Sequence, residues 1–110
     1  GNATREFLYV EDCVEALYSV LKTNFDSPLP INLGTGRSIS IHDLAYLIAR
    51  LTGYNGNIVF TGEVSDGQPK RQLDVTRAQD LLGFTAKTTL MKGLINTICW
   101  YQDNKHLIKD

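Results

Sequence analysis

The sequence is poor in cysteine and carries no excess of charge of either sign. Its two cysteines, Cys13 and Cys99, lie far apart without metal-ligand spacing, so neither a zinc site nor a disulfide framework is expected, and both fit small buried hydrophobes. Eleven Lys and Arg against twelve Asp and Glu give a net charge of −1, which excludes a strongly basic nucleic-acid or membrane-surface protein. No apolar run approaches the roughly 18 residues of a membrane span, and no secretory leader is recognisable. A cytoplasmic protein with no nucleic-acid or membrane partner is therefore expected.

Strand-like and helix-like patterns alternate along the 110 residues, which predicts one small α/β domain. Strands are expected at residues 5–10, 31–33 and 57–60, and helices at 11–22, 41–52, 76–82 and 90–105. Residues 1–4 are interpreted as a loop or cloning remnant, and residues 106–110 as a frayed tail. The best-defined helix begins after Ser40, whose hydroxyl can cap it, and ends at Gly53. Its predicted buried stripe consists of Leu44, Leu47, Ile48 and Leu51.

Two motifs typical of nicotinamide enzymes are incomplete or weak in this chain. Gly34-Thr35-Gly36 follows a predicted strand, but Ile39 stands where a third glycine would be needed, so a tight turn is favoured over a phosphate-binding loop. Tyr18-x-x-x-Lys22 and Tyr101-x-x-x-Lys105 match a catalytic tyrosine-lysine spacing that arises easily by chance, and both tyrosines fall on apolar helix faces. Neither histidine has a second ligand or a nucleophile near it in sequence. No catalytic, cofactor-binding or metal-binding residue is predicted within the chain.

The strongest candidate for binding chemistry is the polar stretch of residues 61–72, together with Arg5 at the head of the first predicted strand. Loops of this length in compact domains tend to be functional. Lys70 and Arg71 offer a point charge and a bidentate fork to a diphosphate, and Asp66 can accept hydrogen bonds from ribose or sugar hydroxyls. This chemistry suits a nucleotide sugar. The alternative is a solvated surface loop whose charges have no ligand.

Four segments resemble, in order, the C-terminal substrate-binding part of extended short-chain dehydrogenases/reductases that act on nucleotide sugars, the NAD-dependent epimerase/dehydratase family. They are residues 5–12 (Arg-Glu-Phe-Leu-Tyr-Val-Glu-Asp), 31–36 (Ile-Asn-Leu-Gly-Thr-Gly), 66–74 and 93–101. The nearest likeness within the family is to the GDP-L-fucose synthases, although Ser65 stands where their loop has proline. In those enzymes the residues matching Arg5 and Asp66 contact the nucleotide sugar. Lys70 and Arg71 match the basic pair of the same loop.

The resemblance implies a substrate-binding lobe of three short strands and four helices over residues 5–105, without the Rossmann lobe of its parent enzyme. That lobe would bind NADP or NAD, whereas this segment would bind a nucleotide-diphosphate sugar and would not be catalytic alone. The intact enzyme is expected to be a homodimer. The nucleotide base, the sugar and the choice between epimerase, reductase and dehydratase stay open. The rival interpretation is a free-standing interaction domain, which would lack the exposed apolar faces of a separated lobe.

Overall fold

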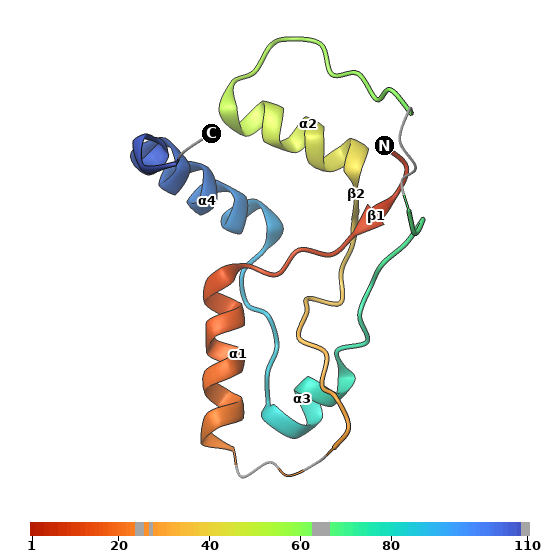
Figure 1. The fold of residues 1–110 in the computed structure, drawn as a ribbon, viewed down its shortest axis with the longest axis vertical. Coiled ribbons are helices and arrows are strands. Elements are labelled where there is room, and N and C mark those ends of the chain that lie inside the picture. The colour runs from red at the N-terminus through yellow and green to blue at the C-terminus, as the bar shows by residue number, and fades with distance from the viewer. Residues whose placement is uncertain (24–25, 27, 63–66, 109–110) are drawn as a thin grey trace.

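The computed structural model describes residues 1–23, 26, 28–62 and 67–108 and shows four α-helices around a minimal sheet (Figure 1). The small α/β class and the four helices are confirmed. No helix in these ranges is long and apolar enough to cross a lipid bilayer. The elements in chain order are β1 (Thr4–Arg5), α1 (Val10–Lys22), β2 (Ile39–Ser40), α2 (Ile41–Thr52), α3 (Thr76–Leu82), α4 (Leu90–Asn104) and one 3₁₀ turn (Lys105–Leu107).

The short strand β1 lies between two other segments of the chain. On one side it pairs antiparallel with β2, so that Thr4 lies opposite Ser40 and Arg5 opposite Ile39. On the other side the Thr4 N–H donates to the Pro69 carbonyl at 2.9 Å, and the Arg71 N–H donates to the Thr4 carbonyl at 3.2 Å. This second contact is parallel. The head of the chain therefore takes part in the fold, and it joins the polar 67–72 stretch to α2.

The strands are shorter than the sequence predicts, and one of them was not predicted. Within the described chain, residues 6–9, 31–33 and 57–60 form no ladder, whereas residues 39–40 do. An extended segment becomes a strand only where a neighbour pairs with its backbone groups, which local sequence cannot supply. Ile31 and Leu33 are nevertheless packed against the buried cluster of Ala16, Ala78 and Phe84. The strand predicted at residues 31–33 is therefore wrong, although its apolar side chains pack on the core.

The helix boundaries agree with the capping signals. The Ser40 hydroxyl accepts a hydrogen bond from the Asp43 N–H at 3.0 Å, and Gly53 ends α2 in the left-handed region with φ of 73°. Thr89 caps α4 in the same way, at 3.2 Å from the Lys92 nitrogen. Hydrogen bonds from the His42 and Ser40 side chains lower the pKa of the Asp43 carboxyl. These local interactions explain why the helices could be placed from sequence.

Little apolar surface is fully buried in the described residues. The buried hydrophobic side chains are Ala3, Ala16, Ala78 and Phe84. α1 packs on α3 at one end of the molecule and α2 on α4 at the other, with β1 between them (Figure 1). The radius of gyration is 16.7 Å, against about 13 Å for a compact chain of this length. The accessible surface is 8427 Å², against roughly 6,100 Å² expected from the mass.

Several residues predicted to be buried are not. The stripe on α2 is only half-buried, and its Ile48 is exposed. Cys99 is exposed and Cys13 is half-buried. Tyr18 and Tyr101 are exposed as well, and the Lys22 ammonium lies 5.1 Å from the centre of the Tyr18 ring. Apolar periodicity identifies the face of a helix that needs covering, but it does not say whether the described chain covers it.

Asp12 is the one buried charged residue in the described chain, and it ties α1 to the segment that precedes α4. Its carboxylate accepts hydrogen bonds from the Thr88 N–H at 3.0 Å and the Thr88 hydroxyl at 3.1 Å. We expect Asp12→Ala to lower the free energy of unfolding by about 2 kcal/mol, because two donors lose a charged acceptor. Urea unfolding of the intact protein measures this. The exposed neighbour Glu11→Ala is the control, and equal losses for both variants would contradict a specific role for Asp12.

Candidate functional site

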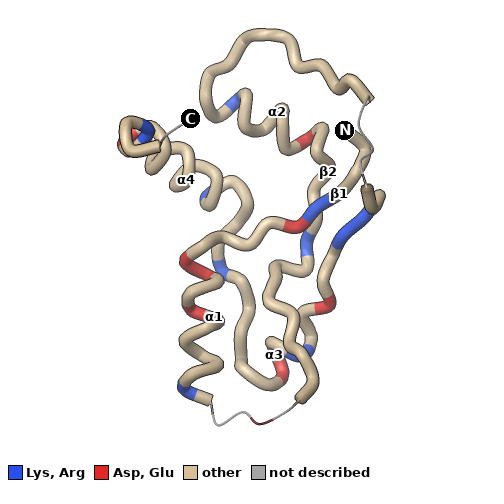
Figure 2. Tube along the Cα trace, in the orientation of Figure 1, with Lys and Arg blue, Asp and Glu red and all other residues tan. Residues whose placement is uncertain are grey.

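Arg5 and Arg71 border one pocket beside β1. The pocket has a volume of about 320 Å³, and Leu8, Leu33 and Leu73 supply much of its apolar lining. Arg5 is half-buried, and one of its guanidinium nitrogens donates to the Thr4 carbonyl at 2.7 Å. Figure 2 shows the basic part of the 67–72 stretch running beside the basic position of β1. The structure therefore brings together two cations that the sequence separates by 66 positions.

The strand geometry separates Arg71 from its neighbour Lys70. Lys70 lies opposite Thr4 in the parallel bridge, so Arg71 lies level with Arg5. Successive side chains of extended backbone point to opposite faces, which places Arg71 on the Arg5 face and Lys70 on the Thr4 face. The pocket lining agrees, because it includes Arg71 and not Lys70. Asp66, the remaining predicted site residue, lies outside the described residues.

Glu6 was not singled out from the sequence, although it is the central residue of the Arg-Glu-Phe segment. One carboxylate oxygen accepts the Thr35 N–H at 3.0 Å, and the other accepts the Leu73 N–H at 3.2 Å. Gly34 has no side chain at the point where a Cβ would collide with the Glu6 carboxylate. The Gln72 amide adds a hydrogen bond to the Gly36 carbonyl at 2.6 Å. The Gly34–Gly36 turn thus accommodates Glu6 and the polar loop.

This arrangement does not fit a dinucleotide phosphate at the glycine turn. The Thr35 N–H is already bonded to Glu6, and α2 begins only at Ile41, so no free helix N-terminus follows the turn. Among the described residues, no group of three or more His, Cys, Asp and Glu side chains could hold a metal ion. The chemistry available at this site is anion binding by guanidinium groups.

The far end of the polar loop is fixed where α3 begins. The Thr76 N–H donates to an Asp74 carboxylate oxygen at 3.0 Å, and the Asn32 amide reaches the Asp74 carbonyl at 3.5 Å. The side-chain and backbone hydrogen bonds from Thr76 lower the pKa of the Asp74 carboxyl. Asp74 therefore stays ionised at neutral pH and serves as an anchor for the backbone.

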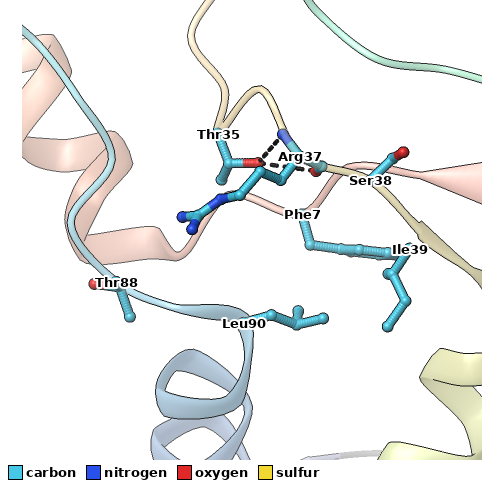
Figure 3. Close-up of a pocket in the computed structure, with 7 residues that line it drawn as sticks. All are labelled: Phe7, Thr35, Arg37, Ser38, Ile39, Thr88 and Leu90. Atoms are coloured by element: carbon cyan, nitrogen blue, oxygen red, sulfur yellow. Dashed lines mark hydrogen bonds between the residues drawn. The ribbon is translucent and has the colours of Figure 1, made fainter.

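A second cavity, of about 250 Å³, lies on the Phe7 side of the chain (Figure 3). Phe7 and Arg37 line this cavity and not the first pocket, which Arg5 and Arg71 border. The Arg37 guanidinium extends toward the Thr88 side of the cavity, and the Phe7 ring lies beside Ile39 (Figure 3). Arg37 was also not singled out from the sequence. A cation beside apolar side chains fits an anionic group attached to a planar one.

Sequence comparison finds relatives that are much longer than this chain. No protein-family model matches it. It is 42% identical over 94 residues to a GDP-L-fucose synthase from Sinorhizobium fredii, an alignment that covers 86% of this chain and 29% of the relative.

Solved structures of similar proteins share the fold. UDP-glucose 4-epimerase from Thermotoga maritima, in a crystal structure with UDP-glucose, has a TM-score of 0.87 at 28% identity. The match covers 96% of this chain and 33% of the epimerase chain. MoeE5, in complex with UDP-glucuronic acid and NAD, has a TM-score of 0.85 at 32% identity. The match covers 94% of this chain and 35% of the MoeE5 chain. The chain spans about a third of the length of these relatives and matches their C-terminal part.

Proposed function

The chain belongs to the NAD-dependent epimerase/dehydratase family of extended short-chain dehydrogenases/reductases, and from this membership we propose that it is the nucleotide-sugar-binding lobe of such an enzyme. The observation that carries the proposal is the pair Arg5 and Arg71 at one pocket beside β1. The parent enzyme would convert a nucleotide-diphosphate sugar with NADP or NAD. Its remaining two thirds would form the Rossmann lobe that binds the cofactor.

The proposed substrate contacts follow from charge and hydrogen-bond chemistry. A diphosphate offers oxygens that the planar guanidinium groups of Arg5 and Arg71 can bind in pairs. Asp66 would accept hydrogen bonds from the ribose or sugar hydroxyls, and Lys70 would add a point charge from the opposite face of the extended segment. Binding energy from these remote groups orients the sugar for the reacting groups of the other lobe. This lobe would therefore determine substrate affinity without performing the chemical step.

The exposed apolar face of α1 supports a partner lobe. Val10, Val14, Leu17, Tyr18 and Leu21 follow helical spacing and are all exposed. Large exposed patches of this kind usually mark interaction sites. We propose that the enzyme's own N-terminal Rossmann lobe covers this face, and that the intact enzyme is a cytoplasmic homodimer.

The more specific proposal is that the parent enzyme resembles the GDP-L-fucose synthases and binds a GDP-sugar. The 42% identity to one such enzyme supports it. The similarity to proteins crystallised with UDP-glucose and UDP-glucuronic acid favours another epimerase or dehydratase as the alternative. Calorimetric titration of the intact protein with GDP and with UDP distinguishes the two. We expect GDP to bind at least about tenfold more tightly, a difference of about 1.4 kcal/mol.

Tighter binding of UDP would replace the GDP-sugar assignment by a UDP-sugar one. Binding of neither nucleotide would favour the rival function, a free-standing interaction domain that kept the fold. A variant that loses both guanidinium groups, Arg5→Ala with Arg71→Ala, is the control for binding at the proposed pocket.

A further inference from the structure

We propose that Glu6 is a positioning residue that sets the spacing between the two arginines of the pocket. The identity of the ligand in this inference rests on the proposed function. The contacts that Glu6 makes with the loop lie within the described chain and do not depend on it. Glu6 does not need to touch the ligand. It would act through the backbone of the polar loop that carries Arg71.

The two oxygens of the Glu6 carboxylate bind different segments. One accepts the N–H of Thr35, 29 positions further along the chain, and the other accepts the N–H of Leu73, 67 positions further along. Glu6 is the residue after Arg5, and Leu73 is two residues beyond Arg71. A single side chain therefore connects the two segments that carry the arginines and joins both to the glycine turn.

Only a carboxylate of this length satisfies both donors. Glutamine has the same shape but only one acceptor oxygen, so its NH₂ group would face one of the two N–H groups. Aspartate is shorter by one methylene and cannot span the same two donors from the same backbone position. Gly34 is required for the same contacts, because any Cβ at this position would occupy the place of the Glu6 carboxylate oxygen.

Few other contacts hold the loop in the described chain. Arg71, Gln72 and Leu73 are exposed, and two backbone hydrogen bonds join the loop to Thr4, one of 2.9 Å to the Pro69 carbonyl and one of 3.2 Å from the Arg71 N–H. The Gln72 side chain supplies two further connections, because its NH₂ group donates to the Gly36 carbonyl at 2.6 Å and its oxygen accepts a hydrogen bond from the Ser38 hydroxyl at 3.4 Å. Loss of the Glu6 carboxylate would therefore release the part of the loop that lines the pocket with Arg5.

The test is Glu6→Gln in the intact protein, with two readouts. Hydrogen–deuterium exchange of the segment 70–76 should become at least about tenfold faster, because the Leu73 N–H loses its acceptor. The Kd for GDP, or for UDP if that binds the wild type more tightly, should rise about tenfold. The Kd for NADP, bound by the proposed other lobe, should stay within about twofold, which a general loss of folding would not allow.

Glu15→Gln is the matched control. Glu15 is exposed and pairs on the surface with Lys87 at 3.2 Å, so neither exchange in 70–76 nor nucleotide binding should change. If Glu6→Gln does not fold, Gln72→Ala removes the other connection to the glycine turn and should change both readouts in the same direction, by a smaller factor.

Unchanged exchange and unchanged nucleotide affinity in Glu6→Gln would overturn the positioning role and leave the proposed function intact. Faster exchange with unchanged affinity would also overturn it, because the loop would be held by Glu6 without consequence for the pocket. If the wild type binds no nucleotide, the proposed function fails, and the pocket role of Glu6 fails with it. The exchange measurement would then show whether Glu6 holds the loop for structural reasons alone.

Discussion

Replacing Arg5 by alanine in the intact protein is expected to raise the KM for the proposed nucleotide-diphosphate sugar about 100-fold. Arg5 is half-buried beside the pocket, where a guanidinium can bind phosphate oxygens in pairs. Hydrogen bonds to charged groups contribute about 1.5–3 kcal/mol, and 100-fold corresponds to about 2.7 kcal/mol. The affinity for NADP or NAD should change by less than about twofold. Steady-state kinetics and cofactor titration measure the two quantities.

The adjacent cations Arg71 and Lys70 give this prediction an internal control. Arg71→Ala should raise KM at least about tenfold, because Arg71 lines the pocket with Arg5. Lys70→Ala should raise it less than about threefold, because Lys70 falls on the opposite face of the extended segment. Arg5→Lys keeps the charge and loses the planar fork, so its KM should lie between those of wild type and Arg5→Ala. A larger effect of Lys70 than of Arg71 would place the substrate on the other face.

The 110-residue chain on its own is expected to self-associate. The α1 stripe of Val10, Val14, Leu17, Tyr18 and Leu21 is 52–84% exposed. These residues occupy one side of the helix at spacings of three and four, so their side chains form one continuous apolar surface. Patches larger than a few hundred Å² are rare on monomeric proteins. A second copy of the chain would cover this surface when the proposed Rossmann lobe is not there to do so.

Sedimentation velocity and dye binding to exposed apolar surface measure this association. The double variant Leu17→Gln with Leu21→Gln should shift the chain toward monomer and reduce dye fluorescence several-fold. Glu11→Gln with Glu15→Gln alters exposed polar positions of the same helix and should leave both readouts unchanged. A wild-type chain that is folded, monomeric and unable to bind dye would contradict the partner-lobe proposal and favour a free-standing domain.

Local sequence determined the helices of this protein. Ser40 and Gly53 delimit α2, and Gly83 ends α3 with φ of 63°, because capping bonds and left-handed glycine connect residues a few positions apart. Sequence chemistry also selected Arg5, Asp66, Lys70 and Arg71 as candidate substrate-binding residues, since the charges of a Gly/Pro-shaped loop are visible without a fold. The resemblance across four ordered segments predicted the family that the comparisons show.

Tertiary structure decided the pairing, the burial and the geometry of the pocket. β2 was not predicted and the expected strand at 31–33 did not form, because pairing depends on which distant segment lies alongside. Glu6 gained its role from two N–H groups in segments far along the chain. A one-residue shift in the register between Thr4 and Lys70 would exchange the faces of the two cations. That register is a contact between distant residues, which neither cation's own neighbourhood in the sequence encodes.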